Sequence, residues 1–434
     1  MPAKLKTHTL GCKVNQYETQ YLREALLANG YQDASKDQPA DLCIVNTCTV
    51  TNEGDSKSRQ IVRRMHRQNP DARIVVMGCY ATRAPDEVAQ LPGVAEVVTN
   101  KRELPDLLGR FGVVDIPNGI SGLNNRHRAY VKVQDGCLLR CSYCIIPAVR
   151  PQMYSRPMSD VLDEVRRLVD RGYREVVLTG IHLGHYGVDF NQGKPKEQWL
   201  RLSRLVRSLC ELPEDFRVRL SSIEATEVTR ELIDVMAEYP KKVCPHLHVC
   251  LQSGSNSVLR RMKRRWTAQH IIDRCELLKR VLDRPALTTD VIVGFPGESD
   301  REFDETMETC RTIGFSKIHM FPFSARKGTP AADMDGQISK AIKTERGKQV
   351  AELELQLKQQ YAQSLQGMDL QLLVENCRDS ENSNAADSNP TRLLQGTTCR
   401  YLPLQLQVNA DQSNPSGSLF DVTVQSVSDT TLHG

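Results

Sequence analysis

The chain of 434 residues lacks any long apolar run. Its first residues, MPAKLKTHTLGC, contain no apolar stretch of the kind that a signal peptide carries, and nowhere do 18 apolar residues follow one another. These absences predict a protein that has no membrane span and stays in the cytoplasm. Fourteen cysteines without a secretory signal then indicate a reducing compartment, where clustered cysteines bind metal more often than they form disulfides.

A strong net charge is also absent, since the whole chain carries only +4. The charge is uneven, however: +2 over residues 1–112, +7 over 113–366 and −5 over 367–434. The densest basic run is residues 260–265, Arg-Arg-Met-Lys-Arg-Arg, and no lysine follows Lys358. A basic run of this kind is typical either of nucleic-acid contact or of a solvated helix face, and the sequence leaves both open.

Six of the cysteines fall into two sets of three, each one ligand short of a closed cluster site. The first set lies in the run GCLLRCSYC and comprises Cys137, Cys141 and Cys144, while the second is dispersed and comprises Cys12, Cys48 and Cys79. A 4Fe–4S cubane takes four thiolates, so three leave one iron open for chemistry. The spacing C-x3-C-x2-C differs from the paired C-x2-C halves of zinc sites.

Alternating strands and helices predict a parallel sheet for residues 1–112. Expected strands are 4–10, 41–47 and 72–78, and Cys12, Cys48 and Cys79 follow their carboxyl ends. Ligands of open α/β sheets bind at that edge, so we expect the three thiols to converge. Cys43, inside the second strand, should face the sheet packing.

A second series of βα units begins after a linker at 113–128. We expect six strands, which is too few for a closed eight-stranded barrel and predicts a partial (β/α)6 barrel over 129–338. A connecting helix is predicted at 339–366 and a small all-β barrel at 367–434. The expected strands of the six units are 129–134, 175–180, 216–222, 246–252, 286–294 and 317–323.

The run GCLLRCSYC after a barrel strand resembles the radical S-adenosylmethionine (SAM) enzymes. Further motifs resemble one group of them, the methylthiotransferases, whose fold combines a flavodoxin-like N-terminal domain, the partial barrel and a C-terminal TRAM barrel. These motifs are TLGCKVNQYET, NTCTVT, MGCYAT, LTGIHLGHYG, SSIEA, LQSGS, TDVIVGFPGE and FPFSARKGTPA, in the order of the family.

The resemblance implies two 4Fe–4S clusters and two SAM molecules per turnover. Cys137, Cys141 and Cys144 would hold the radical-generating cluster, and Cys12, Cys48 and Cys79 the auxiliary one. No acid–base catalytic residue is implied. The matching positions for SAM are Tyr143, Thr179, Gly180, Ser221, Glu224, Gln252, Ser253, Asp290 and Gly294, and for Gly294 a plain turn is an equal alternative.

Within the family, GCKVN and LTGIH look most like the branch that acts on threonylcarbamoyladenosine in tRNA. The implied reaction replaces hydrogen at carbon 2 of that adenosine, next to the anticodon, by a methylthio group. A low-potential donor such as flavodoxin or ferredoxin is implied. Alternatives are isopentenyladenosine in tRNA, an aspartate of a ribosomal protein or, from a different class, a non-catalytic iron–sulfur protein that binds RNA.

The sequence departs from the family pattern at two places. Arg150 is followed by Pro151 where the family usually has glycine, while Arg156 is kept; both arginines are predicted to contact substrate. The C-terminal segment is acidic, so we expect its deletion to weaken tRNA binding only modestly. The spacing of His182 and His185 is common by chance and does not predict a metal site.

Overall fold

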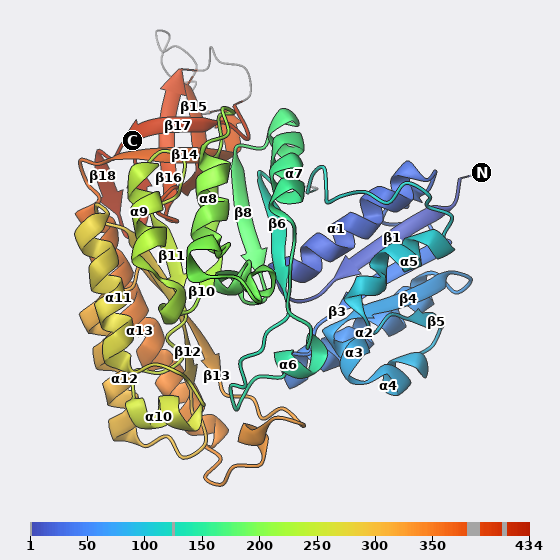
Figure 1. The fold of residues 1–434 in the computed structure, drawn as a ribbon, viewed down its shortest axis with the longest axis horizontal. Helices are drawn as coiled ribbons and strands as arrows, with labels where there is room; N and C mark the ends of the chain where they lie inside the picture. Colours follow the sequence, from blue (N-terminus) through green and yellow to red (C-terminus); the bar gives the residue numbers. More distant parts are fainter. Residues whose placement is uncertain (1, 124–125, 380–390, 410–414) are drawn as a thin grey trace.

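The computed structural model describes residues 2–123, 126–379, 391–409 and 415–434. An N-terminal α/β domain, drawn in blue in Figure 1, forms a lobe beside a central α/β barrel, and a sheet of C-terminal strands packs against one end of that barrel. No helix in the described ranges is long and apolar enough to cross a membrane.

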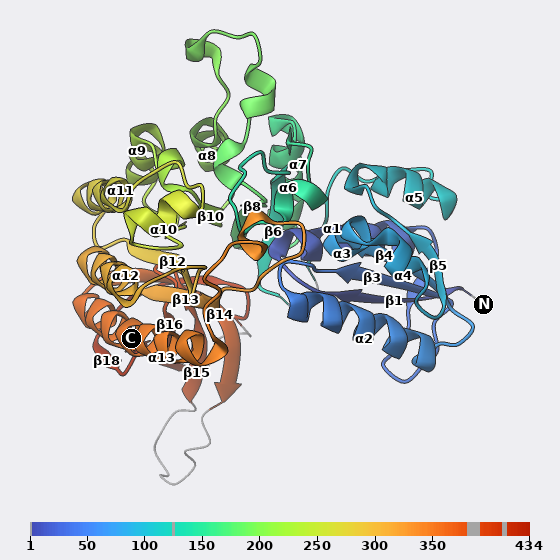
Figure 2. The ribbon, with the colours of Figure 1, turned by 90° about the horizontal axis from the view of Figure 1, so that it is seen from below.

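The N-terminal domain is a parallel sheet with helices on both faces, as expected. Its strand order is β2-β1-β3-β4-β5. Side chains alternate between the faces, so α1 and α5 pack on one and α2 on the other (Figure 2). Cys43 is fully buried within β3. The strands are β1 (Lys4–Thr9), β2 (Gln32–Asp33), β3 (Leu42–Thr47), β4 (Arg73–Gly78) and β5 (Val94–Val97), and the helices α1 (Lys13–Ala28), α2 (Asn52–Gln68), α3 (Cys79–Arg83), α4 (Pro85–Ala89), η1 (Lys101–Glu103) and α5 (Leu104–Arg110).

The central region is a partial barrel of six main parallel strands, which confirms the expected fold. Together with the two-residue strands β7 and β10 they form two sheets, β7-β6-β8-β9 and β10-β11-β12-β13, and an isolated bridge joins Val218 of β9 to Val243 before β11. The strands are β6 (Arg128–Asp135), β7 (Tyr154–Ser155), β8 (Glu175–Gly180), β9 (Arg217–Leu220), β10 (Ser222–Ile223), β11 (His246–Val249), β12 (Ala286–Val293) and β13 (Lys317–Pro322).

Helices cover the outside of the barrel. The long helix α13 (Lys340–Ser364) packs against β13 and α12, and Ser339 caps it at the predicted start. The other helices of the central region are α6 (Ile146–Val149), α7 (Met158–Asp170), α8 (Leu202–Cys210), α9 (Arg230–Glu238), α10 (Asn256–Arg261), α11 (Ala268–Val281) and α12 (Asp300–Ile313), with the short helices η2 (Leu183–His185), η3 (Val188–Asn191), η4 (Lys196–Gln198), η5 (Ala225–Glu227) and η6 (Pro330–Ala332).

The C-terminal residues form a six-stranded sheet of order β17-β14-β15-β16-β19-β18. All its pairings are antiparallel except that of β16 with β19. The strands are β14 (Asp369–Asp379), β15 (Thr391–Thr398), β16 (Pro403–Asn409), β17 (Leu419–Thr423), β18 (Ser426–Ser428) and β19 (Thr431–His433). An all-β C-terminal unit was expected; its assignment as a TRAM barrel stays a prediction.

A buried ion cluster joins this sheet to the barrel. Glu175, the first residue of β8, pairs with Arg217 (2.6 Å), the first residue of β9, and with Arg219 (2.7 Å) two residues further on. Arg217 also donates to the carbonyl oxygens of Gln371 and Thr397. Because these residues begin their strands, the C-terminal sheet lies at the amino end of the barrel, opposite the strand ends that carry the cysteines.

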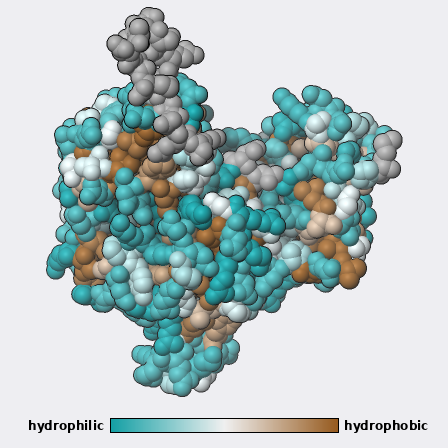
Figure 3. Space-filling model, turned by 90° about the horizontal axis from the view of Figure 1, so that it is seen from above, coloured by the Kyte–Doolittle hydropathy of each residue, from teal (hydrophilic) through white to brown (hydrophobic). Residues whose placement is uncertain are grey.

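Figure 3 shows one face of the molecule, with the N-terminal domain as a separate lobe. Hydrophilic side chains cover most of this face, and apolar residues appear in small patches.

Candidate metal centres at the domain interface

The structure places Cys12, Cys48 and Cys79 at one edge of the N-terminal sheet. They follow β1, β3 and β4, which are neighbours in the sheet, and the register aligns Thr47 with Gly78. Burial, and then the nearby Cys79, raises the pKa of the Cys12 and Cys48 thiols. The three thiols are thus close enough to affect one another's charge.

Two glycines allow this convergence. Gly11 has φ +97°, and a Cβ on it would lie 3.1 Å from the Cys48 sulfur. Gly78 has φ +100°, and a Cβ there would lie 2.3 Å from the Thr47 carbonyl oxygen. Both positions therefore need glycine for the backbone angle and for the close approach of the neighbouring strand end.

The second triad lies on the loop between β6 and α6. The Cys144 amide donates to the Cys141 carbonyl oxygen (3.1 Å), and the Cys137 amide donates to Arg150 (3.3 Å), so the loop closes on itself. Burial, and then the nearby Cys141, raises the pKa of Cys137 to about 11 and that of Cys144 to about 12.

The two cysteine loops touch across the domain interface. Helix α3, which begins at Cys79, packs against α6, which begins two residues after Cys144. Cys79, Ile145 and Val149 form a small buried cluster there. Two triads that lie 58 residues apart at their closest in sequence thus become neighbours in space.

Arg150 links the two loops through its guanidinium group. It donates to Glu18 (2.8 and 2.9 Å), Asn15 (2.9 Å) and Asp135 (2.8 Å), and its Nε lies 3.5 Å from the Cys79 sulfur. Burial would raise the pKa of Glu18, but Arg150 and then Lys132 lower it. Since Arg150 is only 4% exposed, these protein contacts use its donors, and the substrate role predicted for it stays a prediction.

Arg156 and Arg326 make similar contacts between the domains. Arg156 bonds Tyr17 of α1 (3.0 Å) and forms an ion pair with Glu164, so its predicted substrate role also stays a prediction. Arg326, which follows β13, pairs with Asp55 of α2 at 2.8 Å. Glu18 and Arg326 lie inside the motifs TLGCKVNQYET and FPFSARKGTPA, but neither was predicted as a site residue, because a motif does not show which residue of the other domain its side chains meet.

A cavity of about 550 Å³ lies at the same interface. Its lining includes Lys101, Arg102 and Arg156. Lys101 donates to the Gly78 carbonyl oxygen (2.9 Å), and burial lowers its pKa to about 8. The cavity therefore offers basic side chains beside the residues that position Cys79.

Tyr143 and Glu224, both predicted to bind SAM, lie around one arginine. Arg264 pairs with Glu224, and its Nη1 is 3.4 Å from both the Tyr143 hydroxyl and the Cys141 sulfur. Trp266 stacks on the same guanidinium at 4.1 Å. Arg264 belongs to the basic run singled out in the sequence, yet it points into the cysteine site; the tail of the run, Arg265, is exposed.

The other predicted SAM residues lie at or just beyond the carboxyl ends of barrel strands, except Asp290 in the middle of β12, and their SAM contacts stay predictions. Ser253 is fully buried and its hydroxyl bonds Thr306 (3.1 Å). Gly294 has φ +71° and packs against Lys343, a backbone angle that suits a turn, and its contact with SAM stays a prediction. Asp290 lies 3.3 Å from His248. Thr179 and Gly180 end β8, Ser221 follows β9, and Gln252, with φ +66°, follows β11.

The donor chemistry suits two iron–sulfur clusters. All fourteen cysteines lie in described ranges, and all are free thiols. Of the eight outside the triads, seven are buried and Cys377 is half-buried, as expected for packing residues. Each triad instead gathers three thiols on glycine-shaped loops, which is the donor set of a cubane with one open iron.

Comparison with known proteins agrees with this geometry. The Radical SAM superfamily matches residues 131–310, and the family described as uncharacterized protein family UPF0004 matches residues 4–100. The threonylcarbamoyladenosine tRNA methylthiotransferase MtaB of Bacillus subtilis is 40% identical over 88% of this chain and 87% of its own. A tRNA-2-methylthio-N(6)-dimethylallyladenosine synthase of Aquifex aeolicus is 32% identical over 88% of this chain and 90% of its own.

Solved structures share the fold. The radical SAM methyltransferase TsrM from Kitasatospora setae has a TM-score of 0.56 at 14% identity, and covers 89% of this chain and 79% of its own. The radical SAM enzyme OxsB has a TM-score of 0.53 at 12% identity, and covers 81% of this chain and 56% of its own. With relatives this similar over most of its length and two facing cysteine triads, the chain belongs to the radical SAM methylthiotransferase family of enzymes.

Proposed function

We propose that this enzyme inserts a methylthio group at carbon 2 of N6-threonylcarbamoyladenosine next to the anticodon of tRNA. The observation that carries the proposal is the direct contact between the two cysteine loops, through α3 and α6 and through Arg150. A reaction that joins a radical to a sulfur atom needs both centres at one substrate. The substrate branch rests on the 40% identical relative of that name.

The chain's own residues position the reacting centres. When bound, a cluster on Cys137, Cys141 and Cys144 supplies the electron that generates a carbon radical from SAM, and one on Cys12, Cys48 and Cys79 holds the sulfur. Arg150 fixes the separation of the two loops, and the burial around it excludes water. Arg264, with Tyr143 and Glu224, forms the wall beside Cys141 on which SAM is proposed to lie.

tRNA is the proposed macromolecular substrate, with flavodoxin or ferredoxin as the class of electron donor. The cavity is lined by both acidic and basic side chains, of which Lys101 and Arg102 could contact a nucleotide, since phosphate contacts provide much of the affinity in RNA and DNA binding. We also propose that residues 1–112, 129–338 and 367–434 act as auxiliary-cluster, radical SAM and C-terminal domains, joined by a linker at 113–128 and by the helix at 339–366.

Mass spectrometry of tRNA nucleosides tests the reaction and its substrate together. A strain that lacks the gene should lose 2-methylthio-N6-threonylcarbamoyladenosine and accumulate the unmodified nucleoside, and the wild-type gene should restore it. Loss of the methylthio derivative of dimethylallyladenosine instead would favour the function named for the Aquifex relative. Unchanged tRNA with a changed ribosomal protein would reject tRNA as the substrate.

Iron analysis tests the two-cluster chemistry separately. Anaerobic reconstitution should give about eight iron atoms per chain, four for each cubane. Replacement of Cys48 by alanine should leave about four, and SAM cleavage should persist, because Cys48 lies outside the radical SAM loop. About four in the wild type would contradict the proposal of two sites.

A further inference from the structure

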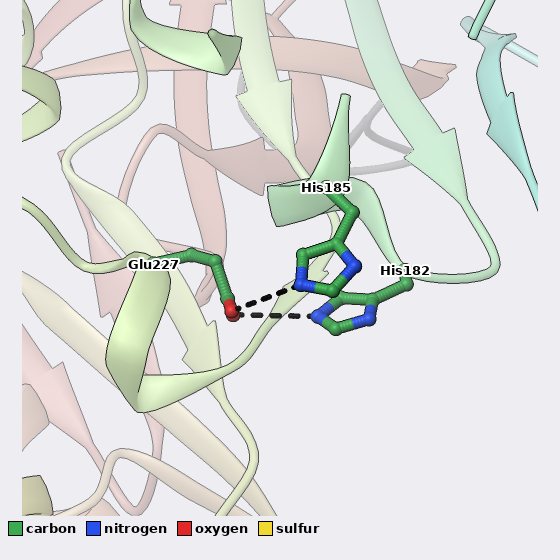
Figure 4. A group of neighbouring side chains, drawn as sticks. All are labelled: His182, His185 and Glu227. Carbon is green, nitrogen blue, oxygen red and sulfur yellow. Dashed lines mark ion pairs between the residues drawn. The ribbon is translucent and has the colours of Figure 1, made fainter. Parts of the chain in front are cut away.

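Two histidines and one glutamate converge at the carboxyl end of the barrel. His182 follows β8, His185 ends η2, and Glu227 ends η5 after β10 (Figure 4). The Glu227 carboxylate lies 3.4 Å from Nε2 of His182 and 3.6 Å from Nε2 of His185. The two imidazole rings stack with centroids 3.6 Å apart, and the Nε2 atom of each ring lies toward the same carboxylate.

Two of the four facing atoms lack a hydrogen-bond partner in the described part of the chain, whereas Oε1 of Glu227 accepts from the Thr226 hydroxyl (2.7 Å). Nε2 of His182 and Oε2 of Glu227 are buried and form no hydrogen bond among the described residues. The His182 side chain is only 4% exposed. Buried polar atoms in proteins are nearly always paired, because an unpaired one has lost its hydration without gaining a partner. The group therefore has unused donor or acceptor capacity directed at its own centre.

The spacing of these atoms fits a shared metal ion. Zinc binds imidazole nitrogen and carboxylate oxygen at about 2.0–2.2 Å, so two ligands of a tetrahedral ion lie about 3.4 Å apart. The two observed nitrogen-to-oxygen distances, 3.4 and 3.6 Å, are close to that value. A hydrogen bond would bring nitrogen and oxygen nearer, to about 2.7–3.2 Å.

His182 has a neighbour for each of its ring nitrogens. Its Nδ1 lies 3.7 Å from the Cys137 sulfur, and its Nε2 is the nitrogen that faces Glu227. Metal-binding histidines typically donate the N–H of their second ring nitrogen to a neighbouring acceptor, so an ion bound to Nε2 leaves Nδ1–H for that role.

Gly184 makes room for the third ligand. A Cβ at this position would lie 2.5 Å from the Cβ of Glu227, so only glycine between the two histidines lets η5 approach η2. His185 and Glu227 also line a cavity of about 820 Å³. Three protein ligands with solvent space on one side match the arrangement of open zinc sites.

We propose that His182, His185 and Glu227 bind one divalent first-row metal ion of the zinc class, in addition to the metal held by the six cysteines. The ion satisfies the unpaired atoms and ties the loop after β8 to the loop after β10. Two imidazoles and one carboxylate form a ligand set that zinc takes in other proteins. Glu227 lies 42 residues beyond His185, which is why the spacing of the two histidines gave no signal.

Metal analysis of the reconstituted enzyme tests the site. Holoenzyme with both clusters is incubated with Zn²⁺ and desalted, and zinc and iron are counted together. We expect about one zinc per wild-type chain, and a loss of zinc affinity of more than about 100-fold in His185→Gln and in Glu227→Gln, since even outer-shell partners contribute 10–100-fold. Iron content should stay unchanged, because neither residue is one of the six cysteines.

His127→Gln is the matched control, since His127 precedes β6 and lies outside the group. Zinc X-ray absorption should show nitrogen and oxygen at about 2.0–2.2 Å without sulfur at about 2.3 Å. Three results would each overturn the proposal. They are wild-type protein that binds no zinc, equal zinc content in the wild type and both variants, and sulfur scattering that places the zinc in a cysteine triad.

Discussion

Arg150 is the residue whose contacts reach both cysteine loops. The sequence predicted that this position matters, because it lies just beyond the third cysteine and precedes an unusual proline. Its contacts with Glu18 and Asn15 could not be predicted, since they join residues more than 130 positions apart. Spacing within one motif carries no information about the surface of another domain.

Replacing Arg150 by methionine should destabilise the enzyme by about 3–5 kcal/mol, because Glu18 would lose its main buried partner. Thermal unfolding of the reconstituted protein measures the change. Arg166→Met is the control: Arg166 pairs with Asp163 on an exposed helix face, and its loss should cost at most about 1 kcal/mol. Equal effects of the two changes would contradict the assigned role of Arg150.

Glu175 should make the free energy of unfolding depend on pH in the acid range. Burial alone raises its pKa, but Arg219 and then Arg217 outweigh this and hold it far below its usual range. Its contribution is therefore full above the unfolded-state pKa of about 4.3 and is lost as the pH falls below it. Glu175→Gln should cost about 3–5 kcal/mol at pH 7, because two buried arginines lose their partner.

Melting temperatures of wild type and Glu175→Gln between pH 7 and pH 3.5 check this prediction. The difference between the two melting temperatures should decrease as the pH falls below about 4.3. Glu96→Gln is a control, since Glu96 pairs with Arg73 and Arg110 near the surface. A difference that increases in acid would reject the assignment of Glu175 as the ionised partner.

At the scale of elements, the strand ends were the most predictable part of the site. Apolar runs with helices between them located three of the five N-terminal strands, β1, β3 and β4, and all six main barrel strands, because a buried parallel strand has few sequence alternatives. The short edge strands β2 and β5, which are exposed or half-buried, were not predicted. The division of the barrel into two sheets between β9 and β10 was not predicted. It depends on how the strands pair, which hydropathy does not reveal.

Gly78→Ala should disrupt the auxiliary site selectively. The new Cβ would lie 2.3 Å from the Thr47 carbonyl oxygen, so β3 or β4 must shift and displace Cys48 or Cys79. Iron after reconstitution should fall from about eight to about four per chain, with SAM cleavage retained. Gly30→Ala is a matched control, since Gly30 also has positive φ (+93°) but open space around it.

That control should keep about eight iron atoms and lose only about 1–2 kcal/mol of stability from its backbone angle. Loss of iron in Gly30→Ala as well would mean that backbone strain, rather than the contact with Thr47, decides cluster binding.

At the scale of the whole molecule, the acidic sheet and the cysteine sites occupy opposite ends of the barrel. The sequence predicted the charge of the C-terminal unit but not its place. Its contacts, such as that of Arg219 with the Cys399 carbonyl oxygen, connect residues 180 positions apart. Deletion of 367–434 would uncover the Glu175 cluster, so point variants are a cleaner test of RNA binding than truncation.

Charge reversal at Arg265 should weaken tRNA binding more than charge reversal at Arg378. Arg265 is exposed beyond α10, near the carboxyl end of the barrel, while Arg378 is exposed on the acidic sheet. The slope of log affinity against log salt should fall by about 1 for Arg265→Glu, as for one lost phosphate contact. A larger effect at Arg378 would assign RNA binding to the C-terminal sheet.

The Glu175 cluster also has a consequence for biosynthesis. Its cover includes Cys399, which leaves the ribosome 180 residues after Arg219. At about 5–20 residues per second, the charged end of the nascent barrel stays open to solvent for roughly 10–40 s. The N-terminal domain is complete before that interval begins, so the last strands to leave the ribosome are the ones that cover the charged end of the barrel.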